Sequence, residues 1–327
     1  MHDLQRYLVE EFAEEYLEGR LTRRDLIRRV LLLTGSAALT ASALAALGVR
    51  PRGVQAAARP PTVLLPQPEA PRFQQVPLHG TEPPAMQTDQ NVVDPNDPAI
   101  QAGMMTYAGT AGDVFAYLAQ PADQDVHPAL VVVHENRGLI EPNMDIGRRY
   151  AKEGYVALVP DLVSRAGGTS QYLDDLARAT AFLGSANPDD LVSDLLAGVS
   201  WLAEQPFVDA GHLGATGFCF GGGLVWRLVE QAPNLVAAVP FYGPNPPLDQ
   251  VPNIQAAVLG IYAELDTRIT NASLDLDAAL DAAGVTHAKW VAPGANHAFF
   301  NNTGAAYNPA DALEAWQRAL AWFATYL

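Results

Sequence analysis

The most reactive side chain of this sequence lies in a glycine-rich segment. Cys219 stands at the centre of Gly217-Phe218-Cys219-Phe220-Gly221, where a glycine lies two residues away on each side. Glycines are needed there when a nucleophile occupies a sharp turn between a strand and a helix, because larger side chains would collide with both elements. The start of a helix also favours the thiolate over the thiol. The segment therefore predicts a nucleophilic cysteine, the alternative being an inert buried cysteine in a packing turn.

Two residues further along the chain complete the set that a cysteine nucleophile requires. Asp266 follows an apolar run at residues 256–262, and His297 lies in a loop segment at residues 294–299. The chain order of nucleophile, acid and base is that of the α/β-hydrolase triad. We expect His297 to accept the proton of Cys219 and Asp266 to orient the imidazole and stabilise its charge. Taken alone, Asp266 also fits a helix cap and His297 a solvated loop residue.

A carboxylate is expected beside the nucleophile. Glu135 directly follows the apolar run at residues 129–134, where a hydrolase needs a backbone N–H group for its oxyanion hole. A nearby carboxylate raises the pKa of a thiol by charge repulsion and can accept a hydrogen bond from the thiol. We therefore predict that Glu135 keeps the resting Cys219 neutral. The alternative is a surface glutamate paired with Arg137 or Arg148.

An alternation of strands and helices from about residue 101 positions these residues. The first two strands are predicted to form a hairpin, and the later apolar strands alternate with helices. This pattern predicts one α/β domain with a mostly parallel central sheet and helices on both faces, as in the α/β-hydrolase fold. The predicted strands are Met104–Ala108, Asp113–Ala119, Ala129–His134, Tyr155–Val159, His212–Thr216, Val236–Phe241, Ala256–Tyr262 and Lys289–Ala292. The predicted helices are Pro142–Glu153, a long helix capped by Asn187, a helix from Phe220, a helix after Asn271, and Pro309–Tyr326.

Four motifs together resemble the dienelactone hydrolase family (carboxymethylenebutenolidases) over residues 101–327. They are His134-Glu135-Asn136-Arg137-Gly138-Leu139, Gly217-Phe218-Cys219-Phe220-Gly221-Gly222, Asp266-Thr267-Arg268-Ile269 and Asn296-His297-Ala298-Phe299.

The resemblance implies an α/β-hydrolase fold, a Cys219-Asp266-His297 triad and a Glu135 that holds the resting thiol. It also implies an oxyanion hole made by the backbone N–H groups of Asn136 and Phe220. The reaction typical of the family opens a lactone ring through a thioester acyl-enzyme and uses no cofactor. This chain is thus expected to be a hydrolase acting on ester bonds.

One segment of the chain departs from the family pattern at residues expected to bind the substrate. Members of the family hold the substrate carboxylate with arginines, one of them shortly after the catalytic histidine, where this chain has Phe300-Asn301-Asn302. Arg268 is the candidate substrate-binding residue here, with Arg178 as an alternative. We expect a lactone or small ester as substrate. A peptidase or thioesterase, and a non-catalytic exported binding module on the same fold, remain alternatives.

Composition excludes several other classes. The 327 residues include 20 Lys and Arg against 36 Asp and Glu, and the net charge of -16 disfavours nucleic-acid binding. The single cysteine excludes an intramolecular disulfide and any multi-thiolate metal site. A zinc site built from His127, His134, Glu135 and His297 lacks ligands paired at helical spacing, so we expect no metal.

The first 58 residues differ in composition from the rest. Residues 1–19 hold six acids and one arginine, with apolar side chains at steps of four, which predicts a short amphipathic helix. Paired Arg23-Arg24, the apolar run Val30–Leu47 and the small residues 56–58 follow in the order of a twin-arginine export signal. We expect export to the periplasm or the cell exterior by the twin-arginine translocase. The alternative is an uncleaved membrane anchor, because the apolar run approaches the length that spans a bilayer.

A linker is predicted between this extension and the catalytic domain. Eleven of the chain's 25 prolines fall within residues 51–100, and prolines block both helices and sheet pairing. The predicted division is therefore an extension at 1–58, a linker at 59–100 and a catalytic domain at 101–327. Apart from the translocase, the expected partner is a small ester or lactone. The sequence predicts no oligomeric state.

Overall fold

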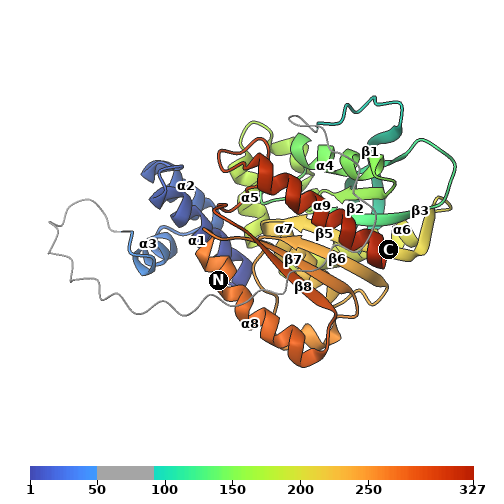
Figure 1. Ribbon diagram of the computed structural model, residues 1–327. Helices are drawn as coiled ribbons and strands as arrows, with labels where there is room; N and C mark the ends of the chain where they lie inside the picture. Colours follow the sequence, from blue (N-terminus) through green and yellow to red (C-terminus); the bar gives the residue numbers. More distant parts are fainter. Residues whose placement is uncertain (50–91) are drawn as a thin grey trace. The chain divides into compact units, whose positions relative to one another are not determined.

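The computed structural model describes residues 1–49 and 92–327. The chain divides into two compact units, Met1–Gln75 and Val76–Leu327 (Figure 1). The predicted cleavage point at residues 56–58 and most of the predicted linker lie outside the described residues, so the boundary at residue 58 stays a prediction. The first strand of the second unit begins at Ile100.

The first unit contains three helices, α1 (Asp3–Leu17), α2 (Arg23–Thr34) and α3 (Ala37–Ala46). The helix α1 matches the amphipathic helix predicted for residues 1–19. The apolar run predicted at Val30–Leu47 is divided between α2 and α3, because Gly35 ends α2 with φ 64° and the Ser36 side chain caps α3. Among residues 1–49 and 92–327, no single helix has the length and hydropathy of a membrane span, although α2 and α3 together meet that test with a bend of 119°.

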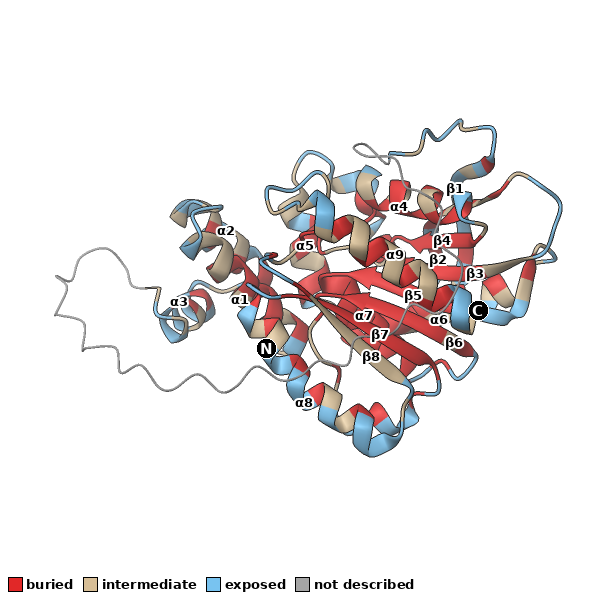
Figure 2. Cartoon of the chain, in the orientation of Figure 1, coloured by how far each residue is buried: buried red, intermediate tan, exposed pale blue. Residues whose placement is uncertain are grey.

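The second unit is built on one eight-stranded sheet with the order β1-β2-β4-β3-β5-β6-β7-β8. The strands β1, β2 and β4 pair antiparallel and the remaining neighbours pair parallel. The central strands are buried, and β4 and β7 are buried along their whole length (Figure 2). The strands are β1 (Ile100–Gly109), β2 (Gly112–Pro121), β3 (His127–Val133), β4 (Val156–Pro160), β5 (Val208–Phe218), β6 (Leu235–Phe241), β7 (Ala257–Ala263) and β8 (His287–Ala292).

Helices cover both faces of this sheet. Figure 1 shows α4 and α9 in front of the sheet and α6 and α7 behind it. On the front face, the rings of Tyr150 in α4 and Trp316 in α9 lie 4.4 Å apart between centroids. The helices are α4 (Glu141–Lys152), α5 (Leu176–Ser185), α6 (Pro188–Ala203), α7 (Phe220–Val229), α8 (Thr267–Ala283) and α9 (Pro309–Tyr326), with short 3-10 turns at Ser164–Ala166, Thr169–Tyr172 and Val251–Asn253.

The predicted α/β class is confirmed. The structure differs from the predicted elements in one helix boundary and in one additional helix. The helix predicted after Asn271 begins at Thr267, because the Asp266 side chain caps it. The helix α5 was not predicted. Its N-cap residue, Asp175, makes no side-chain capping hydrogen bond, so the usual sequence signal for a helix start is missing. The parallel strands β3, β5 and β7 end at the same edge of the sheet, where the candidate residues follow them.

Candidate active site

Cys219 occupies a tight turn between β5 and α7. Its φ of 56° lies in the left-handed region, which costs a non-glycine residue about 1 to 3 kcal/mol. A Cβ atom on Gly217 would lie 2.6 Å from the Gly221 carbonyl oxygen, and one on Gly221 would lie 2.4 Å from the His134 carbonyl oxygen. The flanking glycines therefore allow β5, α7 and the end of β3 to meet at the cysteine.

Asp266 and His297 are brought together by the ends of β7 and β8. His297 Nδ1 lies 2.6 Å from Asp266 Oδ2. Asp266 is buried and also caps α8 by accepting a hydrogen bond from the Ile269 backbone N–H, at 3.4 Å. The capping alternative considered from the sequence thus holds together with the contact to His297. The two carboxylate oxygens serve the two partners separately.

The electrostatics of this pair favour an imidazolium next to a carboxylate. Burial alone would lower the pKa of His297, but the charge and hydrogen bond of Asp266 and a hydrogen bond with Cys219 hold it well above its usual 6.5. Burial alone would raise the pKa of Asp266, but the charge and hydrogen bond of His297, aided by Arg268, bring it below its usual 3.8. The three side chains therefore form one hydrogen-bonded chain from Asp266 through His297 to Cys219.

Glu135 follows β3 and accepts a hydrogen bond from the amide of Asn301. The distance from Asn301 Nδ2 to Glu135 Oε2 is 2.7 Å. Arg148, one of the partners considered from the sequence, instead makes ion pairs with Glu141 at 2.5 Å and Asp145 at 3.6 Å. Asn301 lies 166 residues from Glu135 in the chain, and no sequence motif links the two.

His134 serves the loop that carries Glu135. It is fully buried, and burial lowers its pKa. Its Nε2 accepts a hydrogen bond from the Leu162 backbone N–H at 3.1 Å, which assigns the proton to Nδ1. Nδ1 then donates to the Glu135 carbonyl oxygen at 2.6 Å. His134 is thus a neutral side chain that fixes the backbone at Glu135.

The backbone groups predicted for the oxyanion hole belong to segments in contact. Phe220 is the first residue of α7, where backbone N–H groups have no acceptor within the helix. Asn136 is buried in the loop after β3. The contacts that a Cβ on Gly221 would make with the Val133 and His134 carbonyl oxygens show how closely α7 approaches this loop. Their role in binding an oxyanion remains a prediction.

Tyr242 follows β6 and was not singled out in the sequence. Its side chain is fully buried, its φ is 36°, and its ring lies 5.0 Å from the His297 ring in an edge-on arrangement. Within the described part of the chain its hydroxyl has no hydrogen-bond partner. Burial raises the pKa of Tyr242 well above 10, and the charges of Glu135 and Cys219 raise it further. The hydroxyl therefore stays protonated beside both groups.

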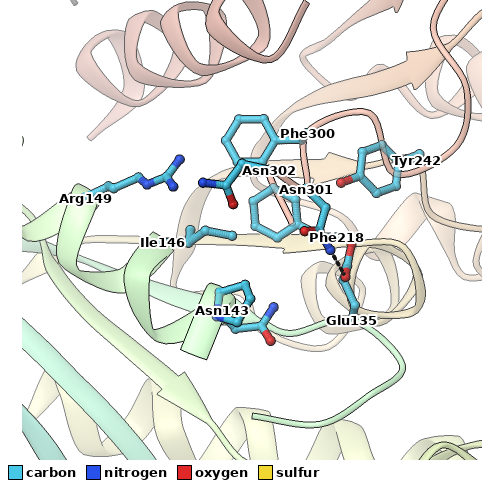
Figure 3. A pocket seen from close by; sticks show the side chains of 10 residues that line it. Glu135, Asn143, Ile146, Arg149, Phe218, Tyr242, Phe300, Asn301 and Asn302 are labelled. Atoms are coloured by element: carbon cyan, nitrogen blue, oxygen red, sulfur yellow. Dashed lines mark hydrogen bonds between the residues drawn. The ribbon is translucent and has the colours of Figure 1, made fainter. Parts of the chain in front are cut away.

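A pocket lies next to these residues (Figure 3). Figure 3 shows the Tyr242 hydroxyl turned toward the side of the pocket where Asn301 meets Glu135. Arg268 does not line this pocket and lies near Asp266, and Arg178 lies over the Tyr172 ring at 5.1 Å. The lining residues are Glu135, Pro142, Asn143, Ile146, Arg149, Phe218, Tyr242, Phe300, Asn301 and Asn302.

Comparison with known proteins gives this geometry a family. The profile of the dienelactone hydrolase family matches residues 114–327. The chain belongs to the dienelactone hydrolase family. A relative from Salmonella typhi named "putative carboxymethylenebutenolidase" is 34% identical over 259 residues, which cover 76% of this chain and 96% of the relative. A relative of the same name from Methylorubrum extorquens is 35% identical over 227 residues, which cover 66% of this chain and 78% of the relative.

Solved structures agree with the family assignment. A dienelactone hydrolase structure from Klebsiella pneumoniae, titled "putative", is 34% identical and has a TM-score of 0.65, covering 70% of this chain and 100% of that one. A dienelactone hydrolase-like promiscuous phosphotriesterase is 22% identical with a TM-score of 0.61, and this likeness concerns the fold alone. The prediction of a dienelactone hydrolase-like enzyme acting on ester bonds is confirmed by the family match.

Proposed function

We propose that this dienelactone hydrolase-like enzyme uses Cys219 as its nucleophile and hydrolyses a lactone or small ester through a thioester intermediate. The observation that supports this proposal most directly is the hydrogen-bonded chain Asp266-His297-Cys219, with the cysteine held at φ 56° between β5 and α7. A buried carboxylate behind a histidine that contacts a nucleophile is the arrangement that acyl transfer requires.

In the first half of the proposed reaction, His297 accepts the thiol proton of Cys219, and the resulting thiolate attacks the carbonyl carbon of the substrate. The negative charge that develops on the carbonyl oxygen is accepted by the backbone N–H groups of Asn136 and Phe220. The imidazolium of His297 then donates its proton to the departing alkoxide oxygen as the C–O bond breaks. The products are a thioester on Cys219 and a free hydroxyl group, which stays attached to the acyl chain when the substrate is a lactone.

In the second half, water hydrolyses the thioester. His297 takes a proton from the attacking water and Asp266 stabilises the imidazolium that forms. Collapse of the tetrahedral intermediate releases the carboxylic acid and restores Cys219. Between turnovers, the Glu135 carboxylate is proposed to accept a hydrogen bond from the neutral Cys219 thiol, which protects the cysteine from oxidation and alkylation because the thiol reacts far more slowly than the thiolate.

The test of this function compares the full-length protein with Cys219→Ala and Cys219→Ser. We expect the wild type to hydrolyse dienelactone or a short 4-nitrophenyl ester, and both variants to lose activity by at least about a thousandfold. Rapid acid quenching and mass spectrometry should detect an acyl adduct on the peptide that contains Cys219. Full activity in Cys219→Ala would refute the proposal and favour a binding protein on this fold.

We also propose that residues 1–58 carry a twin-arginine export signal. The support comes from the order of Arg23-Arg24, the apolar residues of α2 and α3, and the small residues 56–58. Export through the translocase is expected to stop when both arginines are replaced by lysine, and cell fractionation measures this. Unchanged distribution of the Arg23→Lys/Arg24→Lys variant would refute a twin-arginine signal.

A further inference from the structure

Among the described residues that line the pocket beside Glu135, the charged side chains are those of Glu135 and Arg149. Glu135 presents a carboxylate to the pocket and accepts a hydrogen bond there from the uncharged amide of Asn301, at 2.7 Å. Asn302 adds a second uncharged amide. A substrate carboxylate placed here would face the Glu135 carboxylate at short range, where like charges repel.

Arg149 is the positively charged side chain among the described residues that line this pocket, and it is already paired with the buried carboxylate of Asp145. Arg149 Nε donates to Asp145 Oδ2 at 2.7 Å, and Nη2 of the same guanidinium pairs with the same oxygen. Asp145 in turn lies 3.6 Å from Arg148, which is paired with Glu141. Asp145 therefore already compensates the charge of Arg149 at the wall of the pocket.

Tyr242 supplies an uncharged hydrogen-bond donor to the pocket. Its hydroxyl is buried, lines the pocket and lacks a hydrogen-bond partner among the described residues. Leaving a buried hydroxyl unpaired costs about 1 to 3 kcal/mol, so such a group normally has a ligand or water as partner. The Tyr242 ring lies edge-on to the His297 ring at 5.0 Å, which places this donor next to the reacting groups.

We infer that this pocket binds an uncharged oxygen of the substrate, such as an ester carbonyl, through the Tyr242 hydroxyl, and that the enzyme prefers neutral lactones or esters to those carrying a carboxylate. The remaining walls suit such a ligand, because Phe218, Phe300 and Ile146 offer apolar surface on either side of the polar groups. This inference rests on the proposed function, since the pocket selects substrates for the Cys219 site.

Three lactones with the same ring test separately the effect of the substrate's charge and the effect of its hydrogen bond with Tyr242. Outside the ring, dienelactone carries a carboxylate and its methyl ester carries a neutral ester carbonyl. The parent methylene lactone carries neither of these substituents. Ring opening is followed by ultraviolet absorbance with the full-length protein. We expect kcat/KM for the methyl ester to exceed that for dienelactone at least about tenfold. A preference for the carboxylate would overturn the inference.

Tyr242→Phe tests the hydroxyl while keeping the ring. Its kcat/KM for the methyl ester should fall about tenfold, toward the value for the parent lactone, whereas the parent lactone itself should change by less than about twofold. An equal loss on both substrates would assign the hydroxyl to the reacting centre or to folding and would overturn the recognition role. Thermal unfolding of the variant checks that the fold is kept.

Two further substitutions test the charge argument. Asn301→Arg places a cation beside Glu135 and should raise the ratio of dienelactone to methyl-ester activity at least about tenfold. Arg149→Gln should leave that ratio within about twofold, because Asp145 already compensates the Arg149 charge. A selective loss of dienelactone activity in Arg149→Gln would make Arg149 a carboxylate anchor and refute the inference. Failure of the proposed function is distinguishable, because Cys219→Ala would then retain ring opening on all three lactones.

Discussion

Gly221→Ala is the substitution whose effect can be worked most directly from the structure. The added Cβ would lie 2.4 Å from the His134 carbonyl oxygen and 2.5 Å from the Val133 carbonyl oxygen. Ordinary contact begins at 3.4 Å, so α7 and the end of β3 must separate by about 1 Å. Both obstructing atoms belong to the backbone at the end of β3 and just after it, which cannot rotate away as a side chain can. We therefore expect a loss of at least about 3 kcal/mol in the free energy of unfolding.

Activity should fall as well, because the separation occurs at the nucleophile. A displacement of about 1 Å at a reacting group costs about a hundredfold in rate. Urea unfolding and kcat/KM on a chromogenic ester measure the two effects. Gly103→Ala is the matched control, since a Cβ there would meet nothing within 4 Å. If Gly221→Ala unfolded and reacted like Gly103→Ala, the close approach of α7 to the β3 loop would be wrong.

Three further outcomes follow from the buried charges. Asp266→Asn should lower kcat about a thousandfold or more by removing the charge that supports the His297 imidazolium, and steady-state kinetics with circular dichroism as the folding control measures this. The loss of unfolding free energy in His297→Gln should be greatest below pH 6.5 and shrink as the pH rises through the raised folded pKa of His297. The reason is that a raised histidine pKa stabilises the fold only while the proton is bound. A pH-independent loss in urea unfolding would contradict the ion pair. Burial raises the pKa of Glu230 to about 8, so Glu230→Gln should stabilise the protein by an amount that grows between about pH 4.5 and pH 8. Substitution of an exposed glutamate, Glu204→Gln, is the neutral control. No gain in melting temperature at pH 8 for Glu230→Gln would contradict this prediction.

Much of the fold was predictable because its signals are local. Buried parallel strands are continuous apolar runs, and the eight predicted strands all occur in the sheet. The break at Gly35 and the early start of α8 were missed because a single capping residue decides each of them. The helix α5 was missed because its start lacks a capping side chain. Boundaries of this kind depend on one or two hydrogen bonds rather than on a long pattern.

The sequence by itself determined the α/β class, the family, and the order of Cys219, Asp266 and His297, because motif spacing and hydrophobic pattern are written along the chain. Only the tertiary structure decided which residues surround these three. The contact of Glu135 with Asn301 and the placement of the Tyr242 ring beside His297 both depend on how separate loops meet at one edge of the sheet. Such contacts join residues that are distant in the chain, and no local periodicity records them.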